Sequence, residues 1–224
     1  KSSLNKEIVS FNQQLFRFYE RKIRIGIYGK CGVGKSSILN LLLNKNLFKT
    51  GVINGSTNKI QKEEWILKNQ KIKSIELIDS PGFDFCNTNF SDDTYSLINN
   101  SEIILFAIAG DLNRNEISKI NTFISNGKKI IIVLNKVNFY NDKELREIVK
   151  NIKSKIPKDL KIPLIINYNN NLKTYIKETI NQYGELLLTL NSLQSADRLF
   201  LKIKEQRLKK RKREAQSIIG KFST

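Results

Sequence analysis

An eight-residue stretch near the N-terminus has residue types and spacing that suit the binding of an anion. It covers residues 29–36 and reads Gly-Lys-Cys-Gly-Val-Gly-Lys-Ser, which is the pattern Gly-x-x-x-x-Gly-Lys-Ser. The glycines let the backbone curl so that several N–H groups point at one phosphate. The Lys35 ammonium can reach the outer phosphates of a nucleotide, and the Ser36 hydroxyl can ligate Mg²⁺. The stretch therefore predicts a phosphate-binding loop for a nucleoside triphosphate.

The segments on either side provide the context that such a loop needs. An apolar run at residues 23–28 precedes it, and apolar residues with helical spacing follow at residues 37–43. Strand, loop and helix in this order bring the positive end of a helix to the phosphate site. We therefore expect a helix that begins at about Lys35.

A carboxylate followed by a Pro-Gly turn forms a second motif. Asp79-Ser80-Pro81-Gly82 follows an apolar segment at residues 72–78. We expect Asp79 to hold Mg²⁺ through water, and the Gly82 N–H to meet the terminal phosphate because glycine allows close approach. Asp-x-x-Gly alone is a weak signal. About 45 residues after a phosphate-binding loop, it is a strong second indication.

Apolar runs that suit strands alternate with helical periodicities along the rest of the chain. We expect an amphipathic helix over residues 3–20, which packs on the nucleotide domain or on a partner domain. Further strands are expected at residues 60–67, 72–78, 103–109, 129–134 and 162–166, and helices at residues 92–98, 115–125, 145–156 and 172–183. This alternation predicts an α/β fold with a mostly parallel sheet, whose strands carry the ligand at their carboxyl ends.

Three motifs that should meet at the carboxyl ends of the strands, together with one threonine, carry a resemblance to a known family. In order, residues 29–36, Thr57, residues 79–82 and residues 135–138 resemble the translation-factor class of GTPases, and within it the Era-like bacterial GTPases. The resemblance covers about residues 22–184. It implies a Ras-like P-loop fold with a mostly parallel six-stranded sheet and helices on both faces. It also implies Mg²⁺, binding of GTP and GDP, and two switch loops, the second at residues 80–95.

The motifs and the resemblance together define the candidate site. The nucleotide-binding candidates are Gly29, Cys31, Gly32, Val33, Gly34, Lys35, Ser36, Ser37, Asp79, Gly82, Asn135, Lys136, Asn138 and Tyr168. The metal ligands are Ser36, Thr57 and Asp79, and the catalytic residues are Lys35, Thr57 and Gly82. Thr57 resembles the switch threonine that reaches Mg²⁺ only in the triphosphate state. Asn135 and Lys136 match the base-binding signature Asn-Lys-x-Asp.

Three positions depart from the family pattern. Asn138 replaces the last Asp of the base signature, and an amide has one acceptor oxygen where a carboxylate accepts from two guanine N–H groups. GTP remains the expected ligand, with weakened selectivity that extends to a base such as xanthine. Phe83 stands where Ras-type members place the glutamine that orients water, and Asp84 is either its stand-in or a solvated loop carboxylate. Gly32 stands where some relatives hold a potassium ion with an Asn.

These departures lead to three functional hypotheses. The leading one is a molecular-switch GTPase with slow intrinsic hydrolysis, on the order of 10⁻⁴–10⁻² s⁻¹, stimulated by an activating protein or by homodimerisation. One alternative is a nucleotide-binding scaffold that does not hydrolyse. The other is a membrane-associated GTPase similar to dynamins or immunity GTPases.

Composition narrows the class of protein further. The 224 residues carry 39 Lys and Arg against 21 Asp and Glu, a net charge of +18, which favours polyanionic partners or reflects a lysine-rich solvated surface. The absence of histidine excludes an imidazole base or ligand. The two cysteines favour a reducing compartment, and no apolar run approaches the ~18 residues of a membrane span, so we expect a cytoplasmic protein. With no methionine and a start at Lys1, we expect a piece of a longer protein.

The chain is expected to have three regions: a helix at residues 1–21, the GTPase domain at 22–184, and a C-terminal extension at 185–224. In the extension, an apolar stripe with helical spacing leads into the basic block at residues 207–213. Three uses fit this pattern: contact with RNA phosphates, peripheral attachment to an anionic membrane, and a helix that links to a further domain.

Overall fold

The computed structural model describes residues 2–49, 60–67, 71–84, 92–157, 160–167 and 171–222, without the side chains of residues 2, 92–94 and 218–222. The predicted roles of Thr57 and Tyr168, and most of the second switch, lie outside the described residues. The contacts divide the chain into two units, residues 21–185 and residues 1–20 with 186–224. The three-region boundaries expected above stay a prediction.

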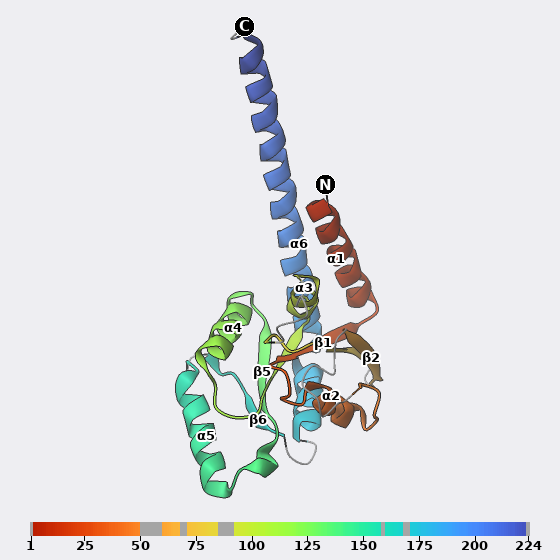
Figure 1. Cartoon of the computed structure of the whole chain (residues 1–224). Helices are drawn as coiled ribbons and strands as arrows, with labels where there is room; N and C mark the ends of the chain where they lie inside the picture. Colours follow the sequence, from red (N-terminus) through yellow and green to blue (C-terminus); the bar gives the residue numbers. More distant parts are fainter. Residues whose placement is uncertain are drawn as a thin grey trace. The chain divides into compact units, whose positions relative to one another are not determined.

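The described part of residues 21–185 forms a six-stranded sheet with strand order β2-β3-β1-β4-β5-β6 (Figure 1). The strands are β1 Lys22–Gly29, β2 Gln61–Ile66, β3 Ser74–Asp79, β4 Ile103–Ile108, β5 Lys129–Leu134 and β6 Leu164–Ile166. All neighbouring strands are parallel except β2 and β3, which are antiparallel. The mostly parallel six-stranded sheet predicted above is confirmed.

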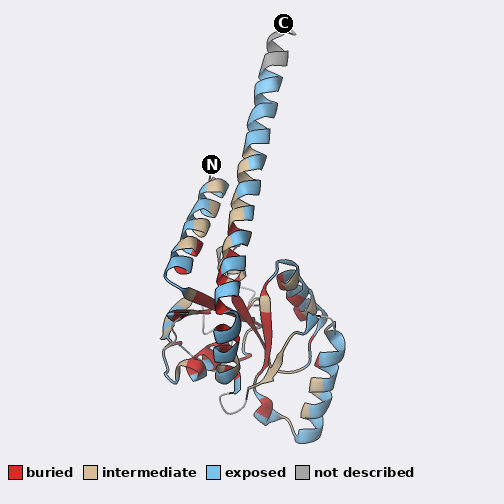
Figure 2. Ribbon diagram, turned by 180° about the vertical axis from the view of Figure 1, so that it is seen from behind, coloured by how far each residue is buried: buried red, intermediate tan, exposed pale blue. Residues whose placement is uncertain are grey.

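Helices cover both faces of this sheet, as predicted. The helices are α2 Lys35–Leu43, α3 Asp92–Asn99, α4 Arg114–Ser125, α5 Asp142–Lys155 and the first part of α6 Asn171–Phe222. One face packs Tyr28, Phe106 and Ile132 against Phe123 of α4 and Ile152 of α5. The alternate residues of β1 are also fully buried, which shows that the opposite face is covered too (Figure 2).

The second unit consists of α1 Ser2–Tyr19 and α6 from Leu186 onward. Its interior is polar: Gln14 Oε1 accepts a 3.1 Å hydrogen bond from Asn191 Nδ2 and another hydrogen bond from the Arg17 guanidinium. On α1, the apolar residues Ile8 and Phe18 are 38% and 37% exposed. Within this unit α1 therefore makes a polar contact with α6, and its expected packing on the nucleotide domain or on a partner domain stays a prediction.

Helical periodicity specifies which residues share a face, but it does not say which face another helix will cover.

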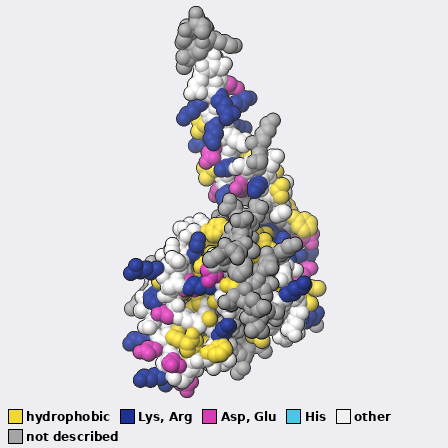
Figure 3. Space-filling view, in the orientation of Figure 1, with side chains coloured by type: hydrophobic (Ala, Val, Ile, Leu, Met, Phe, Trp, Pro, Cys, Tyr) yellow, Lys and Arg dark blue, Asp and Glu magenta, His cyan; other side chains and the backbone are white. Residues whose placement is uncertain are grey.

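Along α6, Lys and Arg side chains gather in the C-terminal part (Figure 3). None of the described helices combines the length and the apolar character needed to cross a membrane.

Candidate nucleotide-binding site

The loop at residues 29–36 connects β1 directly to α2, which begins at Lys35 as predicted. Two glycines are required by its geometry. A Cβ atom on Gly29 would lie 2.4 Å from the Ala107 carbonyl oxygen. Gly34 has a φ of 87° in the left-handed region, and a Cβ there would lie 2.4 Å from Asn135 Nδ2. A side chain at residue 29 would push the loop away from β4, and one at residue 34 would collide with the Asn135 side chain.

Lys35 is held inside this loop. Its side chain is 7% exposed, and Nζ donates hydrogen bonds to the carbonyl oxygens of Gly29, at 3.2 Å, and Lys30, at 2.8 Å. Burial lowers the pKa of Lys35, while the nearby charges of Asp79, Cys31 and Asp84 act in the opposite direction. The ammonium is therefore positioned by the loop and only partly compensated by anionic groups, which suits it to meet phosphate oxygens.

Ser36 and Asp79 form the candidate metal site. Ser36 Oγ donates a 2.5 Å hydrogen bond to Asp79 Oδ2, and Asp79 is fully buried at the end of β3. The other carboxylate oxygen, Oδ1, has no hydrogen-bond partner among the described residues. Burial raises the pKa of Asp79 to about 6, against the opposing effects of the Ser36 hydrogen bond and the Lys35 charge.

A buried carboxylate oxygen without a partner is unfavourable unless a ligand satisfies it. Hydroxyl and carboxylate oxygens are the hard donors that Mg²⁺ prefers, and this ion usually keeps waters and nucleotide phosphates as its other ligands. Within the described ranges, no group of three or more His, Cys, Asp or Glu side chains is arranged to hold a metal ion by itself. The Ser36–Asp79 pair thus fits a Mg²⁺ ion that a nucleotide helps to hold.

The start of the second switch touches the phosphate-binding loop. A Cβ on Gly82 would lie 2.4 Å from the Cys31 nitrogen, so only glycine fits this close approach. The Phe83 ring stacks on Tyr28, with centroids 5.1 Å apart and planes 9° apart, and packs against the core. Asp84 Oδ1 accepts a 2.6 Å hydrogen bond from the Cys31 N–H. Asp84 is thus an exposed loop carboxylate, as one of the two alternatives expected, and it also binds an amide of the loop.

This contact predicts that Asp84 competes with the nucleotide. Replacing Asp84 with Asn keeps the size of the side chain and removes its negative charge. We expect GTP to bind about three- to tenfold more tightly, since the loop amide no longer holds a charge-assisted hydrogen bond. Calorimetric titration of nucleotide-free protein with GTP and GDP measures the change. Asp111→Asn, at an exposed ion pair with Lys155, is the matched control and should have no effect. Unchanged or weaker GTP affinity in Asp84→Asn would contradict the competition.

The base-binding loop follows β5 and is tied to the phosphate-binding loop. Asn135 Nδ2 donates a 2.9 Å hydrogen bond to the Val33 carbonyl oxygen. Asn167, directly after β6, donates from Nδ2 to Asn135 Oδ1 at 2.9 Å. Sequence reasoning named the neighbouring Tyr168 as a nucleotide-binding candidate and missed Asn167. Its place at the carboxyl end of a parallel strand was the available signal.

The structure brings together most of the predicted site, and its outer residues are more exposed. Lys136 is exposed with a φ of 57°, and Asn138 is exposed in the 3₁₀ turn η1 Val137–Phe139. Ser37 is exposed in the first turn of α2, and Gly32 is exposed within the loop. Thr57 and Tyr168 cannot be placed with them because they are not among the described residues.

A phosphate-binding loop, a buried Ser36–Asp79 pair and an Asn-Lys-x-Asn loop lie at the carboxyl ends of β1, β3 and β5. Together they define a P-loop GTPase domain with a Ras-like fold. The chain belongs to the 50S ribosome-binding GTPase family, whose sequence profile matches residues 24–136.

Relatives with known names are similar over part of their length. The tRNA modification GTPase MnmE of Mesoplasma florum is 33% identical over 130 residues, which are 56% of this chain and 28% of the relative. GTPase Der of Campylobacter fetus is 33% identical over 126 residues, which are 54% of this chain and 27% of the relative. This chain thus spans less than a third of either protein.

A solved structure of Era, in complex with MgGDPNP and nucleotides 1506–1542 of 16S ribosomal RNA, has the same fold. Its TM-score is 0.57 at 22% sequence identity, and the match covers 71% of this chain and 56% of that chain. At this identity the likeness establishes the fold alone.

Proposed function

We propose that this protein is a Mg²⁺-dependent molecular switch that binds GTP and GDP and hydrolyses GTP slowly. The observation that carries the proposal is the buried Asp79 carboxylate, with one oxygen on Ser36 and the other available to a ligand beside the phosphate-binding loop. Titration of nucleotide-free protein with GTP, XTP, ATP and GDP, with Mg²⁺ or with EDTA, tests the binding part directly.

Each described residue has a defined task in this proposal. The loop N–H groups and the positive end of α2 bind the phosphates, and Lys35 stabilises charge on the outer oxygens as the terminal phosphate is transferred. Ser36, Asp79 and, by resemblance, Thr57 would hold Mg²⁺, which when bound neutralises charge on the β- and γ-phosphates. The Gly82 N–H would meet the γ-phosphate. A side chain at residue 82 would prevent this close approach, because its Cβ would collide with the Cys31 nitrogen.

The slow rate follows from Phe83. Its ring packs on Tyr28 in the core and cannot orient a water molecule, which the glutamine of Ras-type GTPases does. We therefore assign stimulation to an activating partner or to a second copy of the chain. The cytoplasmic location expected from the sequence remains a prediction.

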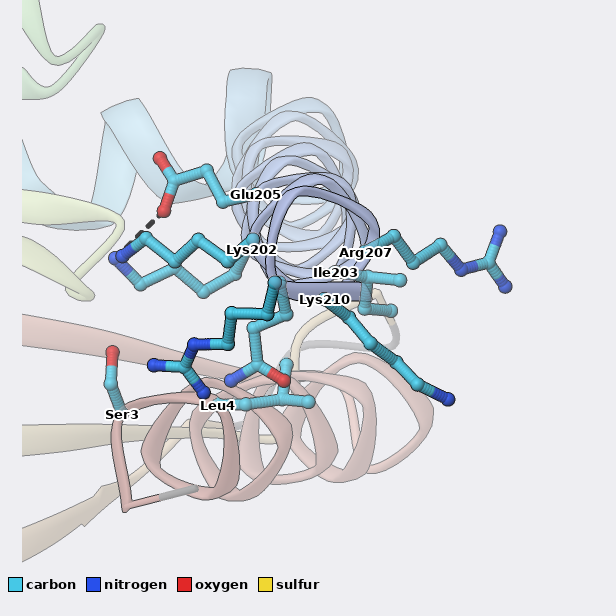
Figure 4. A pocket seen from close by; sticks show the side chains of 10 residues that line it. Ser3, Leu4, Lys202, Ile203, Glu205, Arg207 and Lys210 are labelled. Carbon is cyan, nitrogen blue, oxygen red and sulfur yellow. Dashed lines mark ion pairs between the residues drawn. The ribbon is translucent and has the colours of Figure 1, made fainter. Parts of the chain in front are cut away.

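The basic part of α6 supports a proposal about the partner. A groove of about 630 Å³ lies between the first turn of α1 and α6 (Figure 4). It is lined by five cationic side chains, Lys202, Arg207, Lys209, Lys210 and Arg213, and by one acidic side chain, Glu205, which pairs with Lys202 at 3.5 Å. Clustered Lys and Arg side chains bind polyanionic phosphate backbones. Because the family is described as ribosome-binding and Era was solved with ribosomal RNA, we propose RNA as the occupant of this groove.

Multiple-turnover release of phosphate tests hydrolysis and stimulation in one experiment. Without a partner we expect a rate on the order of 10⁻⁴–10⁻² s⁻¹ that disappears in EDTA. In parallel reactions we add ribosomal RNA, ribosomes or anionic vesicles, and we expect RNA or ribosomes to raise the rate. A double variant, Lys209→Glu with Lys210→Glu, should reduce this effect, whereas Lys143→Glu at the exposed start of α5 should not. No turnover under any condition would favour the scaffold alternative, and stimulation by vesicles alone would favour the membrane alternative.

A further inference from the structure

The C-terminal part of α6 exposes an apolar stripe to solvent. Its members are 47–66% exposed and lie at Leu186, Leu190, Leu193, Phe200, Leu201 and Leu208. At 100° per residue they fall within a sector about 100° wide, which is the width of a helix face that normally packs on another element. Exposed apolar surface of this kind marks an interaction site.

The helix α1 does not cover this stripe. Within the unit, the residues of α6 that are buried are mainly polar, with Asn191 at 4% and Ser195 at 3% exposure, and they lie on the opposite side of the helix. Asn191 donates to Gln14 of α1. The two-helix unit thus buries a polar seam and leaves the apolar face of α6 open, the reverse of the usual arrangement for a helix in water.

Two charged residues interrupt the stripe and indicate what covers it. Asp197 and Lys204 are exposed on the same face as the leucines, and neither makes an ion pair within the described part of the chain. A parallel, in-register partner helix of the same sequence would place like charges opposite each other, Asp197 on Asp197 and Lys204 on Lys204. That arrangement is destabilising.

An antiparallel partner of the same sequence resolves this conflict. With a two-fold axis between residues 200 and 201, Phe200 lies opposite Leu201 of the second copy, Asp197 opposite Lys204, and Leu193 opposite Leu208. Further out, Leu190 lies opposite the aliphatic stem of Arg211, and Leu186 lies opposite Ala215. A two-fold axis makes every such pair twice, as an isologous interface requires. The overlap of residues 186–215 covers about four heptads, or ~45 Å of helix.

We propose that this stripe, residues 186–208 of α6, is a self-association surface that binds α6 of a second copy in antiparallel orientation. The apolar pairs stabilise the interface, and the two Asp197–Lys204 pairs select the orientation and the register. The proposal does not depend on the nucleotide or on the basic groove.

Charge reversal tests the register as well as the interface. Sedimentation equilibrium of the full chain from about 1 to 100 μM should show a reversible dimer of the 25.9 kDa chain. Asp197→Lys and Lys204→Asp should each weaken dimerisation about tenfold or more, which is 1.4 kcal/mol or more. The double variant should return to within about threefold of the original dissociation constant, a recovery that misfolding could not produce. Asp142→Lys, at the exposed start of α5, is the matched control and should change nothing.

Three results would overturn the proposal. The first is a monomer at every concentration. The second is a dimer that both single reversals leave intact, or that the double variant fails to restore. The third is a monomer that co-sediments with phosphatidylserine-containing vesicles through the stripe, which would assign the apolar face to a membrane surface instead.

Discussion

Replacement of Lys35 by alanine is expected to abolish detectable binding of GTP and GDP. The Lys35 ammonium is buried, and two carbonyl oxygens of its own loop hold it at the proposed position of the outer phosphates. Loss of a buried, oriented charge from a charged pair typically costs about 2–5 kcal/mol, so we expect affinity to fall by about 30-fold to several thousand-fold. Titration of nucleotide-free protein with a fluorescent GTP analogue gives the number.

The same variant should remain folded. Burial lowers the pKa of Lys35, which means that the folded protein disfavours its charged form relative to water. Removing that group should therefore not lower the melting temperature of the nucleotide-free protein, as circular dichroism can show. Lys45→Ala, at an exposed lysine just beyond α2, is the matched control for both measurements. Tight GTP binding by Lys35→Ala would refute the assignment of the loop.

Replacement of Asn138 by aspartate is expected to move base selectivity toward guanine. A carboxylate at this position accepts from both the N1–H and the exocyclic amine of guanine, whereas the amide offers one acceptor oxygen and two donors. Gaining one charge-assisted hydrogen bond is worth about 1.5–3 kcal/mol, so GTP affinity should rise about tenfold or more and XTP affinity should fall. Calorimetric titration with GTP, XTP and ATP measures all three.

The control for this variant is Asn121→Asp, which makes the same change on the exposed side of α4. It should leave the order of affinities unchanged. If the original protein already prefers GTP over XTP strongly, and Asn138→Asp changes neither affinity, then selectivity for the base resides in other residues. In that case the departure at Asn138 would not weaken GTP binding.

Much of the fold was accessible from local patterns. The strand expected at residues 129–134 matches β5 at both ends, and α2 begins at the predicted Lys35. Such agreement arises because apolar runs, helical spacing and glycine motifs are local features, and each one restricts the backbone where it occurs. Strand β6 is shorter than expected and begins at Leu164, directly after Pro163, whose nitrogen cannot donate to a ladder.

The contacts of the second switch were not accessible in this way. Asp84 meets the Cys31 amide across 53 positions of sequence, and Phe83 meets Tyr28 across a similar separation. A loop residue belongs to no periodic pattern, so the sequence around it does not indicate which of several possible partners its side chain will contact. The contact of Asp84 with the phosphate-binding loop becomes possible because β1 and β3 lie side by side and parallel in the sheet.

The phosphate-binding end of the site, the α/β class and the order of strands and helices follow from spacing along the chain, because each depends on neighbouring residues. Tertiary packing decided three other features: Asp84 on a loop amide, Asn167 on Asn135, and a polar rather than apolar contact between α1 and α6. Each of these joins segments that are distant in sequence. Only the folded chain shows which of their polar groups come within hydrogen-bond distance and which apolar faces remain open to a partner.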